Sequence, residues 1–488
     1  MNSTRNKLSV ALVAPVILLL FAPILSATEI FVPDDHPTIQ LALAAAADGD
    51  IITVRAGTYS ESIDFLSKAV TLRSQSGAAM TVIDGSMVTW KSVVTFNSGE
   101  SAGSILEGFT ITNGSGISFE EGGGIYCGAG TAPVIRNNII THNGCYNFYG
   151  HCKGGGVYCQ DSSATILNNV ISFNSFNCSS GWGGGIFIDD GEPTIDGNVI
   201  HNNSLSTIAE GSGGGIYCGS GTAQIHNNLL IDNYCGASPG ARGGGIYCGA
   251  GMVTNNTVYS NECDPYSGRG GGIFVPLGAT AVLTNNIVRD NWAPKNPELS
   301  GGDAQVTYCN VKGGWPGTGN IDADPLFADS GRADFHLTYG SPCRDAGTNL
   351  PSGLPDTDFE GDPRIADGTA DIGCDEFHLH LYVQGAITAG ANIYIKVIGS
   401  PQAGPVMLAE GSGILVPPLT TSYGTFYLAT PLLGRYRLGS IPANGVLSVT
   451  AGVPPHWLPG EPHPFQALVG STGNPNTKLT NLMVMRIE

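Results

Sequence analysis

The feature that most constrains this chain is a run of three glycines that returns about every 30 residues. Each run continues with Ile or Val and then an aromatic residue, and successive runs are 32, 29, 30, 30 and 27 residues apart. Glycine disfavours helix interiors and β-branched residues favour strands, so each unit is predicted to be a coil of short strands. Such repeats indicate a solenoid. The six runs begin at Gly122, Gly154, Gly183, Gly213, Gly243 and Gly270.

Every unit also carries two asparagines, five residues apart. In a parallel β-helix the coils stack about 4.8 Å apart, so equivalent residues lie above one another. Stacked amides can hydrogen-bond from coil to coil, and Asn tolerates left-handed turns, so we interpret both columns as structural. The alternative is metal or sugar ligation. The first column is Asn138, Asn169, Asn198, Asn228, Asn256 and Asn286; the second is Asn143, Asn174, Asn203, Asn233, Asn261 and Asn291.

The strand after each glycine run is predicted to alternate between core and surface. The β-branched column Ile125, Val157, Ile186, Ile216, Ile246 and Ile273 is expected to face the core, as is the column Cys127, Cys159, Ile188, Cys218, Cys248 and Val275. Between them lie the aromatics, which are expected to face outward, either stacked between coils or as a platform for sugar rings. These candidate ligand-binding residues are Tyr126, Tyr158, Phe187, Tyr217, Tyr247 and Phe274.

The net charge and the N-terminal segment indicate which partners the protein has and where it is located. The net charge of -19 argues against nucleic acid as a partner. Arg5 and Lys7 precede an apolar run and small residues that end at Ala27, which is typical of a secretory signal peptide over residues 1–27. A transmembrane helix is the alternative, but no second apolar stretch of about 20 residues follows. We therefore expect a secreted, extracellular or cell-surface protein without a transmembrane span after signal removal.

Twelve cysteines in an exported chain favour disulfides. Cys235 and Cys263 each follow a stacked Asn by two residues in adjacent coils, and Cys145 and Cys152 share one loop. These spacings predict a Cys235–Cys263 pair and a local Cys145–Cys152 pair. Buried free thiols that act as small hydrophobic groups are the alternative.

The region before the repeats predicts a cap. Residues 37–47 are expected to form a helix that covers the end of the solenoid, followed by strands at 51–55, 62–65, 69–73, 93–96 and 105–112. The residues Val32-Pro33, Pro37-Thr38-Ile39-Gln40, Asp48-Gly49-Asp50 and Ala56-Gly57-Thr58-Tyr59 resemble the opening of the pectin-lyase-like superfamily. The glycine and asparagine repeats are similar to right-handed β-helix repeat proteins of bacterial exported and surface proteins, and distantly to polymorphic outer-membrane autotransporter passengers.

This resemblance covers residues 29–377 and implies an all-β, right-handed parallel β-helix over residues 28–377. One such scaffold serves lyases, hydrolases, epimerases, esterases and adhesins, so it implies no single activity. From Asn320 onward, Asp322-Ala323-Asp324-Pro325-Leu326-Phe327, Gly340-Ser341-Pro342 and Asp371-Ile372-Gly373 resemble a choice-of-anchor closing segment. In that pattern the positions of Cys343 and Cys374 are usually small and apolar, and their joint departure suggests a disulfide pair. Residues 378–488 predict a separate β-sandwich, similar to C-terminal β-domains of exported bacterial proteins.

Two acidic motifs are candidates for chemistry. Asp189 and Asp190 form the obvious carboxylate pair, and polygalacturonase-like hydrolases use neighbouring aspartates, but their Gly-His-Gly and Arg-x-Lys signatures are missing here. Asp356, Asp358 and Glu360, followed by Gly361 and then Asp367, have the spacing of a calcium loop. A turn rich in Asp and Gly that binds no ion is the alternative.

The sequence therefore predicts a β-helix that binds polysaccharide or the cell envelope, or has an adhesive or structural role. A polysaccharide-active lyase, hydrolase or epimerase is the alternative. Convergent carboxylates and a base in one lateral groove favour the enzyme, whereas a flat aromatic file without them favours binding or structure.

Overall fold

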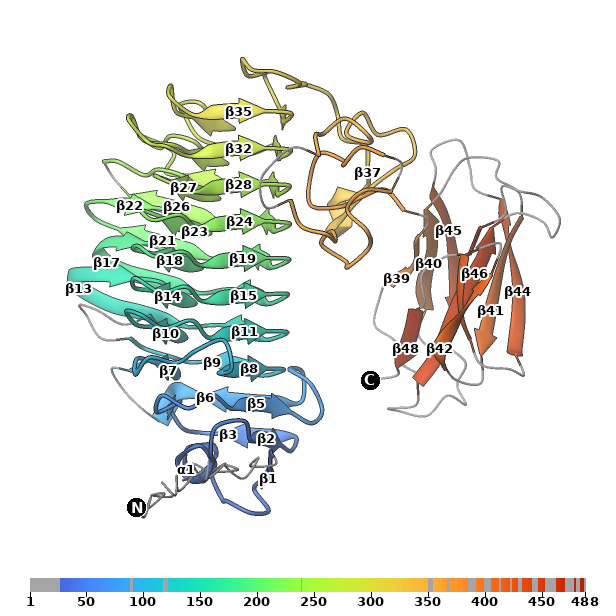
Figure 1. Ribbon diagram of the computed structural model, residues 1–488. Helices are drawn as coiled ribbons and strands as arrows, with labels where there is room; N and C mark the ends of the chain where they lie inside the picture. Colours follow the sequence, from blue (N-terminus) through green and yellow to red (C-terminus); the bar gives the residue numbers. More distant parts are fainter. Residues whose placement is uncertain are drawn as a thin grey trace, which may run out of the picture.

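The computed structural model is a parallel β-helix whose coils stack along one axis, with a closing segment and further antiparallel strands after it (Figure 1). It describes residues 27–87, 91–116, 122–237, 239–349, 354–366 and 368–378, and the strands of residues 380–486 given below. Of the predicted signal peptide, residues 1–27, only Ala27 belongs to the described residues. No helix in the described part of the chain is long and apolar enough to span a membrane.

Each coil runs through three main sheets whose strands pair in parallel. Sheet 1 has eleven strands: β1 (Glu29–Val32), β2 (Ile51–Val54), β5 (Thr71–Ser74), β8 (Ile105–Glu107), β11 (Val134–Arg136), β15 (Thr165–Leu167), β19 (Thr194–Asp196), β24 (Gln224–His226), β28 (Met252–Thr254), β32 (Val282–Thr284) and β35 (Gln305–Thr307). Sheet 2 has ten: β3 (Gly57–Tyr59), β6 (Thr81–Asp84), β9 (Thr110–Thr112), β12 (Ile139–Thr141), β16 (Val170–Ser172), β20 (Val199–His201), β25 (Leu229–Ile231), β29 (Thr257–Tyr259), β33 (Ile287–Arg289) and β36 (Asn310–Val311).

Sheet 3 contains the strands that follow the glycine runs. Its nine strands are β4 (Ile63–Asp64), β7 (Val94–Phe96), β10 (Ile125–Cys127), β14 (Val157–Cys159), β18 (Ile186–Ile188), β23 (Ile216–Cys218), β27 (Ile246–Cys248), β31 (Ile273–Phe274) and β34 (Leu299–Ser300). Both predicted inward columns are confirmed, because every side chain in them is at most 1% exposed. The three sheets thus enclose one continuous apolar core.

A lateral sheet between sheets 2 and 3 was not predicted. It consists of β13 (Gly144–Lys153), β17 (Ser175–Trp182), β21 (Ser204–Thr207), β22 (Gly211–Ser212), β26 (Tyr234–Ala237) and β30 (Glu262–Cys263). Its inner face packs Phe176 and Leu205 with five cysteines in a second apolar cluster. The alternation along β17 and β21 leaves polar side chains on the opposite face.

Both asparagine columns are confirmed as structural ladders. The backbone N–H and Nδ2 of each Asn donate to Oδ1 of the Asn in the next coil, at 2.9–3.1 Å throughout. Every member is at most 6% exposed. The left-handed residue of each turn is the one before the ladder Asn, such as Asn137 at φ 57° and Asn227 at φ 56°, and not the ladder Asn as we expected.

Each ladder ends on a residue that is not asparagine. Asn286 at the end of the first column donates its backbone N–H to Cys309 Sγ at 3.3 Å. Asn291 at the end of the second column donates its N–H and Nδ2 to Glu298 Oε2, at 3.1 and 2.8 Å. These two side chains supply the acceptor that an asparagine Oδ1 supplies in the inner coils.

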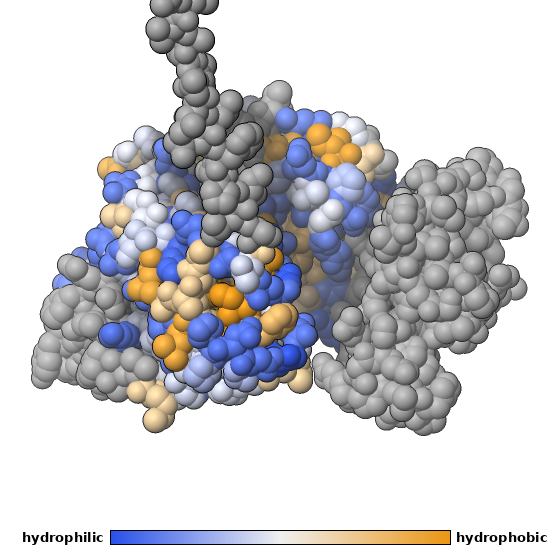
Figure 2. Space-filling model, turned by 60° about the horizontal axis from the view of Figure 1, so that its bottom comes forward, coloured by the Kyte–Doolittle hydropathy of each residue, from blue (hydrophilic) through white to orange (hydrophobic). Residues whose placement is uncertain are grey.

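The predicted N-terminal cap is present and slightly shorter than expected. Helix α1 (Ile39–Ala45) begins after Thr38, whose hydroxyl accepts from the Leu41 N–H, and it buries Ile39, Ala42 and Leu43. The Glu61 carboxylate accepts from the first N–H groups of the helix. Figure 2, which brings this end forward, shows apolar residues grouped among hydrophilic ones. Predicted strand 105–112 divides into β8 and β9, and residues 57–59 form the additional short strand β3.

The closing segment packs on the outer face of sheet 2. Its hairpin of β37 (Phe327–Asp329) and β38 (Asp334–Leu337) encloses the 3₁₀ turn η2 (Ser330–Arg332), and another turn, η1 (Gly85–Met87), follows β6. Phe335 and Cys374 pack against Leu229 and Ile231 of β25. Arg364 is 1% exposed and donates to Asn227 Oδ1 at 2.6 Å and to the Cys374 carbonyl at 2.7 Å. These contacts fix residues 354–378 to the coils.

Antiparallel strands follow the closing segment. They are β39 (His380–Gln384), β40 (Asn392–Ile398), β41 (Pro405–Gly411), β42 (Ile414–Thr421), β43 (Gly424–Leu428), β44 (Leu432–Ser440), β45 (Val446–Gly452), β46 (Pro462–Val469), β47 (Lys478–Leu479) and β48 (Met483–Arg486). The pairings β39–β40–β45, β44–β41–β46 and β42–β43 are all antiparallel. These strands agree with the β-structure predicted for residues 378–488, while the β-sandwich itself stays a prediction.

Candidate functional site

A hollow of about 560 Å³ lies where sheet 2 meets the lateral sheet. Its walls carry Ser175 and Asn177 of β17, Ser204 and Ser206 of β21, and the ring of Phe173. Ser175, Asn177 and Ser206 are exposed, and Ser204 is partly exposed. Within the described part of the chain, none of these four polar side chains makes a hydrogen bond to the protein. The hollow therefore presents open hydroxyl and amide groups beside an aromatic ring.

Phe173 has an unusual backbone for its size. It lies in the left-handed region at φ 53°, is 48% exposed, and stacks on His142 with ring centroids 5.4 Å apart. Bulky side chains rarely adopt this conformation, which costs on the order of 1–3 kcal/mol and is found most often at functional sites. In the other coils the same turn position holds His142, Asn202, Asp232, Ser260 and Asp290. This substitution in an otherwise polar column is a sequence signal that we missed.

The aromatic file exists and is continuous along the axis. Neighbouring ring centroids are 5.4, 5.1, 5.0, 4.6 and 5.5 Å apart from Tyr126 to Phe274. Tyr126, Tyr158 and Phe187 are buried, whereas Tyr217, Tyr247 and Phe274 are partly exposed with their rings within 18° of parallel. Because each ring of this second group is stacked on its neighbours, mainly the ring edges and the tyrosine hydroxyls remain accessible to a ligand. This geometry favours stacking between coils over a sugar platform.

Asp189 and Asp190 have different surroundings. Lys153 Nζ and Tyr158 Oη each lie 3.5 Å from Asp189 Oδ2, and the Lys153 ammonium is 5.1 Å from the centroid of the Phe187 ring. Asp190 is exposed, and its Oδ1 accepts from the Gly191 N–H at 2.9 Å. The two carboxylates therefore have separate partners, and Asp189 is the one that lies beside a lysine ammonium group.

The hydroxyls of the file are poor acids. Burial and then the neighbouring Tyr247 raise the pKa of Tyr217 to about 12, and burial raises the pKa of Tyr247 as well. Both hydroxyls stay protonated at neutral pH and can donate hydrogen bonds.

The predicted calcium-loop residues divide between different partners. Asp358 organises its own loop, because Oδ1 accepts from the Glu360 and Asp362 N–H groups and Oδ2 from the Glu376 N–H. Glu360 bonds His336 instead. Among the described residues, no group of three closely placed ligand atoms contains both Asp358 and Glu360, and none contains Asp356. Asp367 lies outside the described residues.

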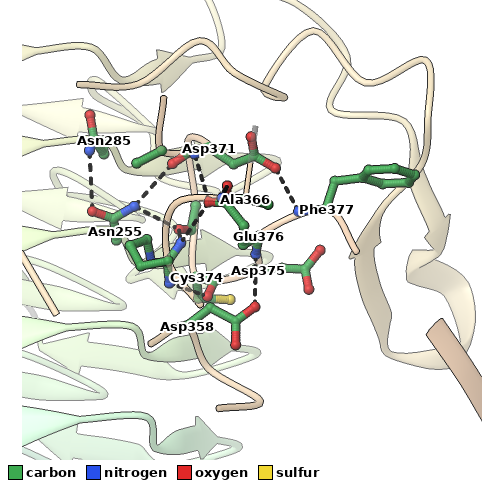
Figure 3. A network of polar contacts seen from close by, with 12 residues as sticks. Asn255, Asn285, Asp358, Ala366, Asp371, Cys374, Asp375, Glu376 and Phe377 are labelled. Atoms are coloured by element: carbon green, nitrogen blue, oxygen red, sulfur yellow. Dashed lines mark hydrogen bonds and ion pairs between the residues drawn. The ribbon is translucent and has the colours of Figure 1, made fainter. Parts of the chain in front are cut away.

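A buried acidic network lies in the closing segment, and sequence reasoning missed it because its members have no periodic spacing. Asp371 accepts from the Asp345 and Phe377 N–H groups, and Glu376 accepts from the Ala366 and Asp371 N–H groups (Figure 3). Burial raises the pKa of Asp371 to about 6, and burial and then Asp371 raise that of Glu376 to about 8.

The cysteines correct one expectation. All twelve are buried and free, so the structure contains no disulfide. Cys343 packs with Leu337 and Ile372, whereas Cys374 lies in the separate cluster around Phe335, so the pair suggested by the resemblance is not formed.

Cys235 does lie opposite Cys263 in adjacent strands, and Cys152 Sγ lies 3.6 Å from the Cys145 carbonyl oxygen, but neither pair is bonded. Burial raises the pKa of the Cys343 and Cys374 thiols to about 12 in each case. The structure therefore contains buried free thiols, which were the alternative to disulfides.

Comparison with known proteins adds a fold-level match. A family model described as a right-handed beta helix region matches residues 60–230. No curated protein and no solved structure matches the chain significantly. Together with the parallel sheets, the match establishes a right-handed parallel β-helix solenoid, a fold that supports a structural or polysaccharide-related protein.

Proposed function

We propose that the protein is an exported, extracellular or cell-surface β-helix that binds polysaccharide in the hollow between sheet 2 and the lateral sheet. The observation that carries the proposal is Phe173, an exposed ring in a costly conformation beside four polar side chains that make no hydrogen bond within the described part of the chain. Sugars present an apolar face and several hydroxyls, which match one aromatic ring and a row of Ser and Asn groups. The net charge of -19 favours a neutral polymer over a polyanion.

The substitution Phe173→Asn separates binding from folding. Asparagine adopts the left-handed conformation readily and already occupies this turn position at Asn202, so we expect the variant to be at least as stable as the wild type. Loss of one aromatic contact, about 0.5–1.5 kcal/mol, is expected to weaken binding by about tenfold at most. Binding to a panel of neutral and acidic polysaccharides is measured by calorimetry, and stability by urea unfolding.

Two further variants locate the ligand. A double change, Asn177→Ala with Ser206→Ala, removes polar groups from the hollow and is expected to weaken binding further. Tyr247→Ala alters the aromatic file and leaves the hollow intact, so it tests the sugar-platform alternative. If Tyr247→Ala abolishes binding while Phe173→Asn binds like the wild type, the ligand lies on the file and the proposal for the hollow is wrong.

A second candidate function is polysaccharide cleavage around Asp189. It is favoured by one observation, the approach of Lys153 Nζ and Tyr158 Oη to the same carboxylate oxygen at 3.5 Å. A carboxylate that can accept a proton beside a group that can donate one is the minimum that acid–base chemistry on a sugar requires. The same panel tests it: cleavage products from the wild type that disappear in Asp189→Asn, and persist in Asp190→Asn, would establish the enzyme.

A further inference from the structure

Three potential metal ligands converge in the closing segment, away from the hollow and the aromatic file. His336 comes from β38, Glu360 from the following loop, and Asp375 from the end of the segment that packs on sheet 2. One ligand atom from each lies within 4.8 Å of the other two, and His336 Nε2 is 2.9 Å from Glu360 Oε1. A divalent ion bound between them would bridge parts of the chain that are separated in sequence.

The Asp375 carboxylate supplies an independent observation. Its Oδ2 accepts from the Leu337 N–H at 2.7 Å, but Oδ1 is buried and has no hydrogen-bond partner, while the whole residue is 5% exposed. Figure 3 shows this carboxylate directed away from the network that joins Asp371 and Glu376. A buried carboxylate oxygen without a partner is costly, and a bound cation would satisfy it.

Asp334 contacts the ring nitrogen of His336 that faces away from Glu360. Its Oδ1 lies 2.6 Å from His336 Nδ1, and the residue is 4% exposed. A carboxylate on one imidazole nitrogen fixes the orientation of the ring, so that the other nitrogen can bind a metal ion, as in many metal sites. Here the other nitrogen, Nε2, points to Glu360.

We propose that His336, Glu360 and Asp375 bind a divalent transition metal ion of the Zn²⁺ and Mn²⁺ class, which ties β38 to residues 354–378. One imidazole nitrogen with carboxylate oxygens suits these ions, whereas Ca²⁺ takes oxygen ligands alone. The site differs from the calcium loop expected from sequence, because it uses only Glu360 of that motif. The neighbouring group of Asp358, Asp362 and His378 is a weaker candidate, since both oxygens of Asp358 already accept from the backbone.

The full-length protein is first stripped with a chelator and then titrated with Zn²⁺, Mn²⁺ and Ca²⁺ by calorimetry. We expect one strongly bound Zn²⁺ or Mn²⁺ per chain, with the melting temperature raised by the ion. Glu360→Gln removes a ligand whose side chain is 31% exposed, so the fold should tolerate it, and the affinity should fall by about a hundredfold. Asp334→Asn should weaken binding by about 10- to 100-fold without abolishing it.

Asp362→Asn is the matched control, because it belongs to the neighbouring group and should leave the affinity unchanged. Co²⁺ gives a second readout: its visible absorption on binding should show a nitrogen ligand that is lost in His336→Gln. If His336→Gln does not fold, the comparison of Glu360→Gln with Asp362→Asn decides alone. The proposal is overturned if the wild type binds neither Zn²⁺ nor Mn²⁺, if Ca²⁺ alone binds, or if Glu360→Gln and Asp362→Asn bind the ion equally.

Discussion

Replacing one ladder asparagine tests how much the ladders stabilise the solenoid. Asn228 is fully buried and makes five side-chain hydrogen bonds. Its Oδ1 accepts from the N–H and Nδ2 of Asn198, and its Nδ2 donates to the Ile195 and His226 carbonyls and to Asn256 Oδ1. Asn228→Ala removes all five and leaves a space that is already closed to water.

The expected loss follows from which partners are left without a bond. The Asn198 N–H loses its acceptor inside a fully buried site, which costs about 1–3 kcal/mol. Asn198 Nδ2 keeps the Ile166 and Asp196 carbonyls, and Asn256 Oδ1 keeps the Asn228 N–H, so the other losses are partly compensated. We therefore expect Asn228→Ala to lower the free energy of unfolding by about 2–4 kcal/mol.

Urea unfolding followed by far-ultraviolet circular dichroism measures this loss. The control is Gln224→Ala in the same coil, because Gln224 is partly exposed and its side chain makes no hydrogen bond in the described part of the chain. Hydrogen exchange should show faster exchange around Asn198 and Asn256, since coils contact only their neighbours. If both variants have the same unfolding midpoint, the ladder contributes little and the reasoning is refuted.

Two further predictions concern the aromatic file and a ladder end. Tyr247→Ala removes a ring whose centroid lies 4.6 Å from that of Tyr217 and 5.5 Å from that of Phe274. The variant should lower the free energy of unfolding by about 1–3 kcal/mol, measured by urea unfolding. Its affinity for polysaccharide, measured by calorimetry, should not change. Burial raises the pKa of Glu298 above its ordinary 4.5, although hydrogen bonds from Asn291 lower it. The stability that protonated Glu298 contributes is therefore complete below the unfolded pKa and is lost as pH rises through the folded pKa. When the free energy of unfolding is measured from pH 4 to 8, Glu298→Gln should become more stable relative to the wild type as pH rises. A difference between the two proteins that does not change with pH would contradict this.

The repeated part of the fold could be predicted because each of its columns repeats a single physical requirement. The β-branched residue after each glycine run is buried in all six coils, and the two asparagine columns form the ladders that their spacing indicates. The lateral sheet could not be predicted in the same way. All of its strands except β22 begin just after the second asparagine, but their lengths range from two residues in β22 and β30 to ten in β13, so the repeat sets no common strand length there.

The candidate sites were less predictable, because they depend on contacts between distant residues. The aromatic residues were correctly placed outside the core, but the burial of Tyr158 and Phe187 depends on Lys153 and Trp182 from the lateral sheet. His336 and Asp375 are 39 positions apart in the chain, and neither belongs to a motif. Phe173 could have been found by aligning the turn positions, since it alone is apolar there.

The ladders also determine how the length of this protein can change. An inner coil accepts hydrogen bonds from the coil before it and donates the same set to the coil after it. A duplicated coil would therefore satisfy its own donors and leave those of its neighbours undisturbed, whereas Cys309 and Glu298 each occur once and only at the last step. Length can thus grow or shrink by whole coils of about 30 residues between fixed ends, in steps of about 4.8 Å along the axis.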